Sequence, residues 1–472
     1  MDRINAFLAS RWGWLLVALV AVAVLIINPV GYIGGVQDDA RYLTAARCWV
    51  EHAAPCLPTN HWAVRWPAVA PLALFTGLFG ESRFTVGLGP LLGWLATIML
   101  VGALASAWFD RRAGLIAAAL IASLPTIALS AVQPSIDNIE LAFQLAALLA
   151  ATMAYRRQCR WTALAAGVLA GLAVASRDTG LLFCAAAAAG WLVLGREKRR
   201  VLLFAIPGLL GTLALEMLVY AAATGDAFFR YRLALAHTSL PSTELLGVDT
   251  AKSPLFNPEI IAAWHRDAGI HWYWPIDSWA NLVASPFVRD LFIAAALLAP
   301  FGWRAMPKLW RWRLARVLGG AMMMAMGLVY ALAIDPKPRM FLALEAAIVI
   351  ALAAMVSALM GRGRGLVPLT LVVVVILMSG WRLSSAVNTQ LVEERARQWI
   401  AAHPNDLAID ELPRSVLALV PEAQALPPPS ANTRFRMSGT GEVCETFGLS
   451  IVDRVGERPG GELCLLSRVK AP

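Results

Sequence analysis

The sequence predicts an all-α polytopic membrane bundle of about eleven transmembrane helices, with interfacial helices on its outer side and a small C-terminal α/β domain outside the membrane. Three observations support this fold class. Of the 472 residues, 59% are hydrophobic and 15% are charged, whereas roughly 25% are charged in soluble domains. Several apolar runs reach the roughly 20 residues that cross a hydrocarbon core. Basic residues gather in alternate connections between these runs, which is typical of cytoplasmic loops.

The first apolar run, at about 12–30, is long and has no small-residue cleavage site after it. We therefore interpret it as a retained helix and not as a removed signal peptide. A long outer loop, 31–83, follows it. Further apolar runs predict the remaining spans at about 84–108, 113–131, 139–155, 162–176, 181–194, 201–223, 287–303, 317–334, 340–360 and 366–384.

The charges of the connections predict the orientation of the chain. Alternate connections are basic, through Arg111 and Arg112; Arg156, Arg157 and Arg160; Arg196, Lys198, Arg199 and Arg200; Arg304, Lys308, Arg311, Arg313 and Arg316; and Arg362 and Arg364. The N-terminus is thus predicted to be cytoplasmic and the tail from about 385 to lie outside. These loops also account for the net charge of +9. Because the sequence has no Gly-Lys-Ser/Thr phosphate loop and no aromatic–basic surface, we expect membrane lipids and no nucleic acid as partners.

The first outer loop begins with the run Gly34-Gly35-Val36-Gln37-Asp38-Asp39-Ala40-Arg41-Tyr42-Leu43, which places two carboxylates, a guanidinium and a phenol just beyond a membrane-length segment. Residues 40–53 can form a helix with one apolar side. The segment 66–79 is apolar but contains two prolines, and its length of about 14 residues is too short for a comfortable span. We expect it to be a helix in the membrane interface, because a span there would invert every later loop.

The cysteines fall in pairs on the outer side, with two in the first outer loop and two in the tail, which fits an oxidising compartment. We predict the disulfides Cys48–Cys56 and Cys444–Cys464; the alternative is four unpaired thiols. The remaining two, Cys159 and Cys184, fall in a cytoplasmic loop and in a span.

Two outer connections carry charges beside apolar spans. Asp137 lies at the mouth of the fourth span and Glu140 about one turn inside it, where a carboxylate is costly and usually has a partner or a function. The alternative for Asp137 is simple N-capping of a helix. Arg177 lies in the tight turn Ser176-Arg177-Asp178-Thr179-Gly180, for which the alternative is a surface ion pair between Arg177 and Asp178.

A later outer connection contains Lys337 and Arg339, on the side opposite to the basic loops. Outer cations of this kind favour an anion there, such as a lipid phosphate. The long outer loop 224–286 is rich in aromatic residues, which are typical either of the bilayer interface or of stacking on sugar rings. A loop of this length is often a lid over an active site.

The composition divides the chain into a transmembrane module, 1–384, and a small extracytoplasmic domain, 385–472. In the second part we predict an amphipathic helix at 388–402, a short strand at 407–410 and further strands within 434–470. About 85 residues are enough for a small α/β domain.

The run Asp38-Asp39-Ala40-Arg41-Tyr42, the interfacial segment after it and Asp137 in the second outer loop resemble the GT-C membrane glycosyltransferases. Within these, the sequence is most similar to the dolichyl-phosphate-mannose protein mannosyltransferase-like group and the bacterial aminoarabinose transferases. Gly80 before the second span, Arg177 before Gly180, and the run Arg339-Met340-Phe341-Leu342 also fit. The resemblance covers about 1–360. Met340 stands where these families often have tyrosine.

The resemblance implies a hexosyl- or pentosyltransferase that moves a sugar, with inversion, from a polyprenyl-phosphate donor to a glycan, lipid or protein acceptor at the periplasmic face of a bacterial inner membrane. Asp38 is expected to be the catalytic base, with Asp39 beside it. The expected substrate-binding residues are Arg41, Tyr42, Asp137, Arg177, Lys337 and Arg339. Some relatives use a divalent cation, for which Asp38 and Asp137 are the candidate ligands; no other cofactor is expected.

Two other functions compete with this interpretation. A membrane transporter would show internal repeats and polar groups at the midplane, whereas the polar groups here gather on the outer face. A polymerase or ligase of lipid-linked glycans would share the donor but not the first outer loop.

Overall fold

The computed structural model describes residues 12–29, 37–193, 199–235, 274–331, 338–386, 400, 435–438, 451–456 and 463–467. Most of these residues are helical, as predicted. The helices are α2 (Gly13–Ile27), α3 (Gln37–Glu51), α4 (Trp66–Phe79), α5 (Arg83–Trp108), α6 (Arg111–Ser123), α7 (Pro125–Leu129), α8 (Asp137–Arg157), α9 (Arg160–Ser176), α10 (Gly180–Leu192), α12 (Ala205–Thr224), α13 (Phe229–Leu235), α16 (Trp274–Ala284), α17 (Arg289–Ala305), α18 (Lys308–Met326), α19 (Leu342–Gly361) and α20 (Leu366–Ala386). Short helical turns at Arg200–Phe204, Gly327–Ala331 and Pro338–Met340 extend or precede three of them.

Each predicted span coincides with one of these helices, but two of them differ in detail. The run 113–131 is broken after Leu124, because Pro125 has no N–H to continue the bonding of α6 and instead opens α7. The span predicted at 317–334 begins earlier, since α18 starts at Lys308 and carries its basic residues in its first turns.

Six helices of the described chain are long and apolar enough to cross a membrane, and a seventh is formed if Ser278–Ala284 and Arg289–Ala305, bent by 94°, count as one span. The helices α2, α4, α9 and α10 are apolar but shorter. The protein is thus an integral membrane protein with fewer full-length spans than the sequence predicts. Of these, α2, α9 and α10 lie in the same bundle, where packing against longer neighbours tolerates them.

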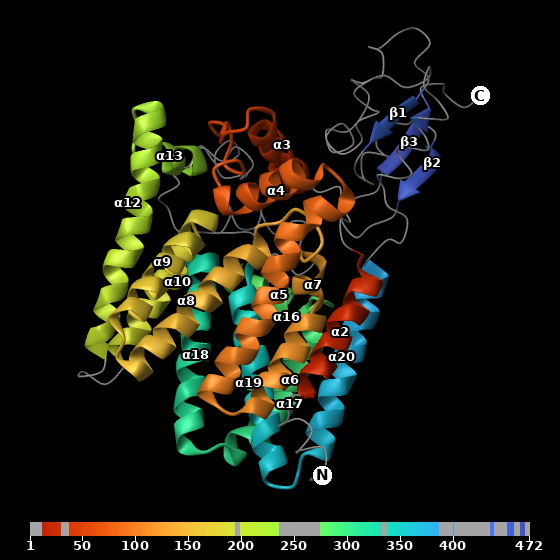
Figure 1. Cartoon of the computed structure of the whole chain (residues 1–472). Coiled ribbons are helices and arrows are strands. Elements are labelled where there is room, and N and C mark those ends of the chain that lie inside the picture. The colour runs from red at the N-terminus through yellow and green to blue at the C-terminus, as the bar shows by residue number, and fades with distance from the viewer. Residues whose placement is uncertain are drawn as a thin grey trace.

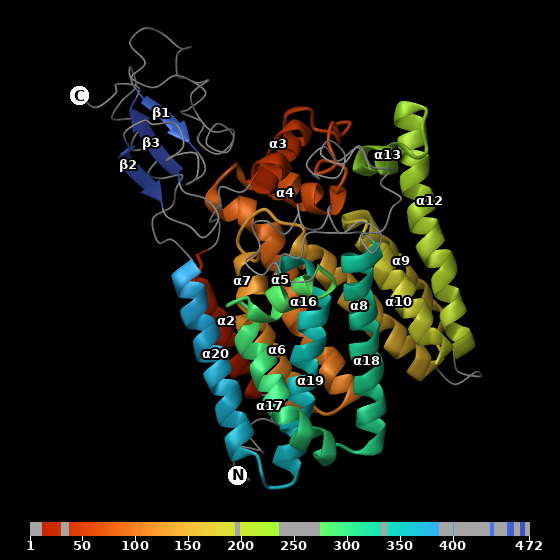
Figure 2. The same cartoon turned by 180° about the vertical axis from the view of Figure 1, so that it is seen from behind.

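The basic connections come together at one end of the bundle. Arg313 of α18 donates a hydrogen bond to the carbonyl of Trp108, and Arg156 of α8 donates one to that of Ala107. At the other end, α3 and α4 lie across the helix ends with α13 beside them (Figure 1). The segment Trp66–Phe79 is therefore a separate helix with the predicted bounds. The view from behind shows the same division (Figure 2).

Helix α19 forms the centre of the core. Its sequence is apolar on all sides, which is typical of a helix surrounded by others, and nearly every residue from Leu342 to Met360 is buried. It packs against α17, α18 and α6. Arg339, which precedes its first turn, lines a cavity together with residues of α8 and α18.

The C-terminal part contains the strands β1 (Phe435–Ser438), β2 (Ile451–Gly456) and β3 (Leu463–Ser467). They form an antiparallel sheet in the order β1-β3-β2, in which Met437 pairs with Leu465 and Arg454 with Cys464. The strands predicted within 434–470 are thus present. The predicted helix 388–402 and strand 407–410 lie outside the described residues apart from Ile400, so the α/β domain stays a prediction.

Candidate active site

The centre of the candidate site is a buried ion pair between Asp137 and Arg177. Arg177 Nη2 lies 2.7 Å from Asp137 Oδ1, and the exposed fractions of the two side chains are 14% and 3%. The hydroxyl of Ser135 donates a hydrogen bond of 3.0 Å to the other carboxylate oxygen of Asp137. The structure therefore brings together two of the predicted residues. N-capping does not explain Asp137, because α8 begins with this residue and has no side-chain cap.

Glu140, one turn further along α8, completes the cluster. Its Oε1 accepts hydrogen bonds from Thr179 Oγ1 at 2.6 Å and from Gln144 Nε2 at 2.8 Å, and its Oε2 lies 3.5 Å from Arg177 Nη1. Burial alone would lower the pKa of Arg177, but the carboxylates of Asp137 and Glu140 raise it above its ordinary value. Arg177 therefore stays charged between two carboxylates.

The turn between α9 and α10 holds Arg177 in this place. α9 ends at Ser176, whose hydroxyl donates to the carbonyl of Leu172 at 2.8 Å. A Cβ atom on Gly180 would lie 2.6 Å from the backbone nitrogen of Val174. Only glycine lets α10 begin this close to α9, and the short turn that results directs Arg177 and Thr179 toward α8.

Tyr42 links the first outer loop to the same site. It is buried, and its phenol oxygen accepts a hydrogen bond of 2.8 Å from Arg65 Nη1. Tyr42 contributes to the raised pKa of Arg177, and Arg65 interacts electrostatically with Glu140. Arg41 has a different position, because its guanidinium stacks on the Trp62 ring, 3.4 Å from the centroid.

Asp38 and Asp39 lie in the first turn of α3, which begins at Gln37. Their side chains lie outside the described residues. Because positions four apart share one face of a helix, position 38 is on the face of α3 that carries Tyr42.

Arg339 borders the same space as this cluster. A small cavity of about 30 Å³ is lined by Asp137, Glu140 and Arg177 together with Arg339. Arg339 interacts electrostatically with Asp137. Lys337, predicted to act with Arg339, lies outside the described residues.

A second, larger cavity of about 410 Å³ adjoins the first one, between α8, α10, α18 and α19. Leu141, Gln144, Ala321, Met324 and Ala343 border both cavities. Most of the larger cavity is lined by apolar side chains. The cluster of Asp137, Arg177 and Arg339 therefore stands at the polar end of an apolar space inside the bundle.

Asp137, one of the two candidate metal ligands, does not fit a divalent cation in this arrangement. One of its oxygens faces Arg177 and the other accepts a hydrogen bond from Ser135, so the guanidinium takes the place of a cation. Among the described residues, one group of three metal-binding side chains lies close enough to hold an ion, namely Cys48, His52 and Cys56.

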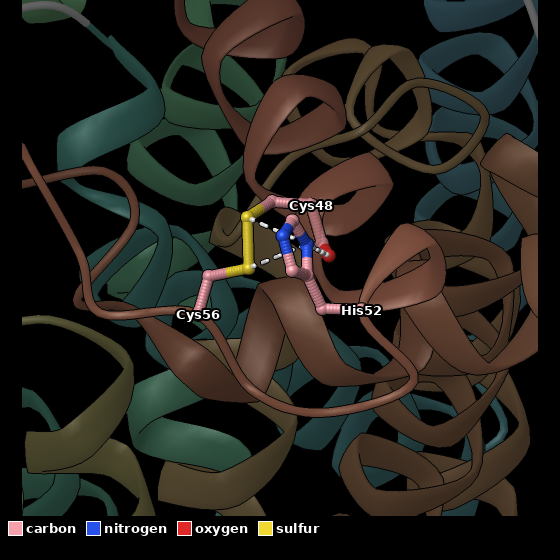
Figure 3. The surroundings of a disulfide bond; sticks show 3 residues. All are labelled: Cys48, His52 and Cys56. Carbon is pink, nitrogen blue, oxygen red and sulfur yellow. Dashed lines mark hydrogen bonds between the residues drawn. A yellow bond between two sulfur atoms is a disulfide. The ribbon is translucent and has the colours of Figure 1, made fainter.

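Those two cysteines form the predicted Cys48–Cys56 disulfide, which connects the end of α3 to the loop after it (Figure 3). The Cα atoms lie 6.1 Å apart, and His52 Nδ1 lies 3.7 Å from each sulfur. Cys159 and Cys184 are free, as predicted. The other predicted disulfide includes Cys444, which lies outside the described residues.

The sequence prediction missed a second buried ion cluster beside the first. Arg230 of α13 donates to both oxygens of Glu216 in α12, at 2.8 and 3.1 Å, and to the carbonyl of Val174 at 2.8 Å. It also lies 3.5 Å from Asp178. Arg177 pairs with Asp137 and Glu140, so the alternative of a surface pair between Arg177 and Asp178 does not hold. Trp66 Nε1 of α4 donates to Glu216 at 2.9 Å. A single carboxylate within an apolar span was the signal that could have found this cluster.

The same signal marks Glu345, also missed, in the first turn of α19. It is fully buried and accepts a hydrogen bond from the hydroxyl of Thr126 in α7. This contact fixes α19 against the helix that follows the break at Pro125. Glu345 does not line either of the two cavities.

Comparison with known proteins supports the fold. The segment 67–221 matches the dolichyl-phosphate-mannose-protein mannosyltransferase family. No curated protein matches the chain by sequence. Among solved structures, the oligosaccharyltransferase of Archaeoglobus fulgidus in complex with Zn and sulfate has a TM-score of 0.53 and 16% identity, over 82% of this chain and 55% of that one. AglB of the same organism, in complex with an inhibitory peptide and a dolichol-phosphate, has a TM-score of 0.50 and 13% identity, over 82% and 57%.

The chain thus spans little more than half the length of these oligosaccharyltransferases. ArnT of Cupriavidus metallidurans bound to undecaprenyl phosphate aligns over 98% of this chain and 99% of its own at 14% identity, but its TM-score of 0.40 is too low to carry an argument. Residues 67–221 thus match the dolichyl-phosphate-mannose-protein mannosyltransferase family, and 82% of the chain shares the fold of the Archaeoglobus fulgidus oligosaccharyltransferase; both matches agree with the resemblance to the GT-C membrane glycosyltransferases.

Proposed function

We propose that this chain is a glycosyltransferase that moves a sugar from a polyprenyl-phosphate donor to an acceptor. One observation carries the proposal: the charged cluster around Asp137, Arg177 and Arg339 stands at the mouth of an apolar cavity of about 410 Å³. A donor of this class has a charged phosphate on a long hydrocarbon chain. The cations would hold the phosphate, and the cavity would remove part of the chain from water and from lipid.

Arg339 is the main phosphate ligand in this proposal. Arg177 is shared by two carboxylates at 2.7 and 3.5 Å, so much of its charge is already balanced. Arg339 lines the same cavity. Lys337, two residues earlier in the chain, would add a second cation. Arg177 then orients Asp137 and Glu140 and limits their repulsion of the arriving phosphate.

Asp38 would act as the base that accepts the proton of the acceptor hydroxyl or amine. As that nucleophile bonds to the anomeric carbon, the bond from this carbon to the phosphate oxygen breaks. The polyprenyl phosphate is the leaving group, and Arg339 stabilises its negative charge. A single displacement of this kind inverts the configuration. Position 38 lies one turn before Tyr42 on α3, and Tyr42 accepts a hydrogen bond from Arg65 and interacts electrostatically with Arg177, which supports a location near the cavity. Asp39 and Arg41 would position the acceptor.

The outer end of the bundle, with α3, α4 and α13, would face the periplasm of a bacterial inner membrane, since the basic connections gather at the opposite end. The acceptor, a glycan, lipid or protein, would then reach the site from the periplasm. The loop 224–286 would cover the site, and the domain 385–472 would contribute to acceptor recognition.

The test is incubation of the purified protein with a panel of polyprenyl-phosphate sugars and a periplasmic extract, followed by mass spectrometry of the lipids and acceptors. We expect one donor to be converted to free polyprenyl phosphate while an acceptor gains the mass of its sugar. An Asp38→Ala variant serves as the control. Donors that all stay intact would overturn the proposal, and movement of a solute across proteoliposomes without sugar transfer would favour a transporter.

A further inference from the structure

The end of the larger cavity that lies opposite the candidate active site is also charged. Three arginines line it: Arg156 at the end of α8, and Arg313 and Arg316 in the first turns of α18. We infer that this end binds the phosphate headgroup of an anionic phospholipid from the leaflet on the basic side of the bundle, with one acyl chain inside the cavity.

Two of the three guanidinium groups are fixed at the cavity. Arg156 donates to the carbonyl of Ala107 and Arg313 to that of Trp108, both at the end of α5. Within the described part of the chain, none of the three forms an ion pair with a carboxylate. The nearby carboxylate of Asp110 accepts hydrogen bonds from Ser357 and from the backbone N–H of Ala113. A cluster of three cations that no carboxylate of the described residues neutralises favours an anionic ligand.

The surroundings of these arginines favour a lipid over a soluble anion. Trp108, Tyr155 and Trp191 line the same end of the cavity, and aromatic residues of this type are common where a membrane protein meets the lipid headgroups. Beyond them the lining is apolar, so a headgroup at the arginines would have a hydrocarbon slot beside it. Basic pockets between transmembrane helices on the cytoplasmic side are known to bind lipid headgroups. Arginine suits this role because its planar guanidinium can bind two phosphate oxygens at once.

The headgroup position proposed here is separate from that of the donor phosphate, whereas the acyl chain and the donor's hydrocarbon chain would enter the same apolar cavity from its two ends. Asp137 and Arg156 lie at the two ends of α8, about 19 residues and roughly 28 Å apart at 1.5 Å per residue. The two headgroups would therefore occupy opposite leaflets. Binding of the phospholipid can be measured with no donor present, so the inference does not depend on the transferase reaction.

The experiment is a titration of phosphatidylglycerol into purified, delipidated protein in neutral detergent, with the bound lipid counted by native mass spectrometry. Arg316→Gln is the primary variant, because Arg156 and Arg313 also hold backbone carbonyls of α5. Arg362→Gln is the matched control, since Arg362 is an exposed arginine that follows α19 at the same end and does not line the cavity. We expect Arg316→Gln to weaken lipid binding about tenfold, as for one lost charge-assisted hydrogen bond, and Arg362→Gln to leave it unchanged.

Two further measurements make the result specific. Phosphatidylcholine should compete poorly with phosphatidylglycerol, and excess inorganic phosphate should not displace the bound lipid, because it cannot fill the apolar slot. The thermal unfolding of Arg316→Gln in detergent alone should match that of the wild type. Equal lipid binding by wild type and Arg316→Gln, equal losses in both arginine variants, or displacement by inorganic phosphate would each overturn the inference.

Discussion

Arg177 Nη2 lies 2.7 Å from Asp137 Oδ1, and this single contact joins the end of α9 to the first residue of α8. The ion pair is buried at the outer end of the bundle, with Glu140 as a second carboxylate 3.5 Å from the guanidinium. Its function in the proposed site and its contribution to folding can be separated experimentally.

An Arg177→Gln variant should be destabilised by about 3–5 kcal/mol, because it leaves two carboxylates buried without their counter-charge. Thermal unfolding in detergent measures this loss. Adding Asp137→Asn to Arg177→Gln should recover part of it, since one of the stranded charges is removed. Strictly additive losses in the double variant would show that the two side chains do not interact as described.

An Asp38→Ala variant should lose sugar transfer by at least about a hundredfold, the usual contribution of a general base, while it still inserts and folds. Transfer rate and size-exclusion profile are the two measurements. Glu51→Ala is the control, since Glu51 is an exposed carboxylate at the other end of the same helix. Full activity of Asp38→Ala would remove this residue from the reaction.

An Arg339→Gln variant should bind polyprenyl phosphate about tenfold more weakly, because a charge-assisted hydrogen bond to the phosphate is lost. Donor affinity and the KM for donor should change together, with little effect on expression. Arg362→Gln is the control. Arg362 follows α19 at the end opposite to Arg339, so this substitution should leave the donor affinity unchanged. If Arg339→Gln binds the donor as tightly as wild type, the phosphate lies elsewhere.

Two neighbouring glycines of α18 test the role of the apolar cavity. Gly320 lines the cavity of about 410 Å³, Gly319 does not, and an added Cβ meets no atom within 4 Å at either position. A Gly320→Leu variant should place its side chain in the cavity and raise the KM for a long-chain donor several-fold. Gly319→Leu should behave like wild type, since leucine is the better helix former at both sites. Equal effects of the two substitutions would argue against a donor chain in this cavity.

Removal of the disulfide by Cys48→Ser with Cys56→Ser should destabilise α3 locally by about 2–4 kcal/mol. Hydrogen exchange should show faster opening of α3, and transfer should fall because Tyr42 and position 38 lie on this helix. Unfolding of the rest of the bundle should change little. A Cys159→Ser variant, which removes a free cysteine, should match wild type.

The sequence predicted the helices of the bundle well because apolar runs and alternating basic loops constrain a membrane chain strongly. The bounds of α4 and the Cys48–Cys56 pairing follow from the same topology. The break before Pro125 was missed, because the run 113–131 is apolar enough to be taken as one span and its average hydrophobicity does not show the effect of a single proline.

The partners of the site residues could not be predicted, because they depend on which helices are neighbours. The sequence offered Asp178 as the nearest partner for Arg177, whereas packing of α9 against α8 supplied Asp137 and Glu140. Packing of α12 and α13 in turn supplied Glu216 and Arg230 as the partners around Asp178. The predicted topology placed Asp137, Arg177 and Arg339 on the same outer side of the membrane. Only the structure shows that they line one cavity.

The adjacent residues Arg177 and Asp178 belong to different ion clusters, one on α8 and one on α12 and α13. Two residues joined by one peptide bond therefore fix how α9 and α10 align with α8 and with α12 and α13. The close approach of Gly180 to Val174 leaves no room for an extra residue in the turn. Inserting or deleting one residue between Ser176 and Gly180 could preserve one cluster only by breaking the other. This turn is thus the place in the bundle where chain length, more than side-chain identity, is constrained.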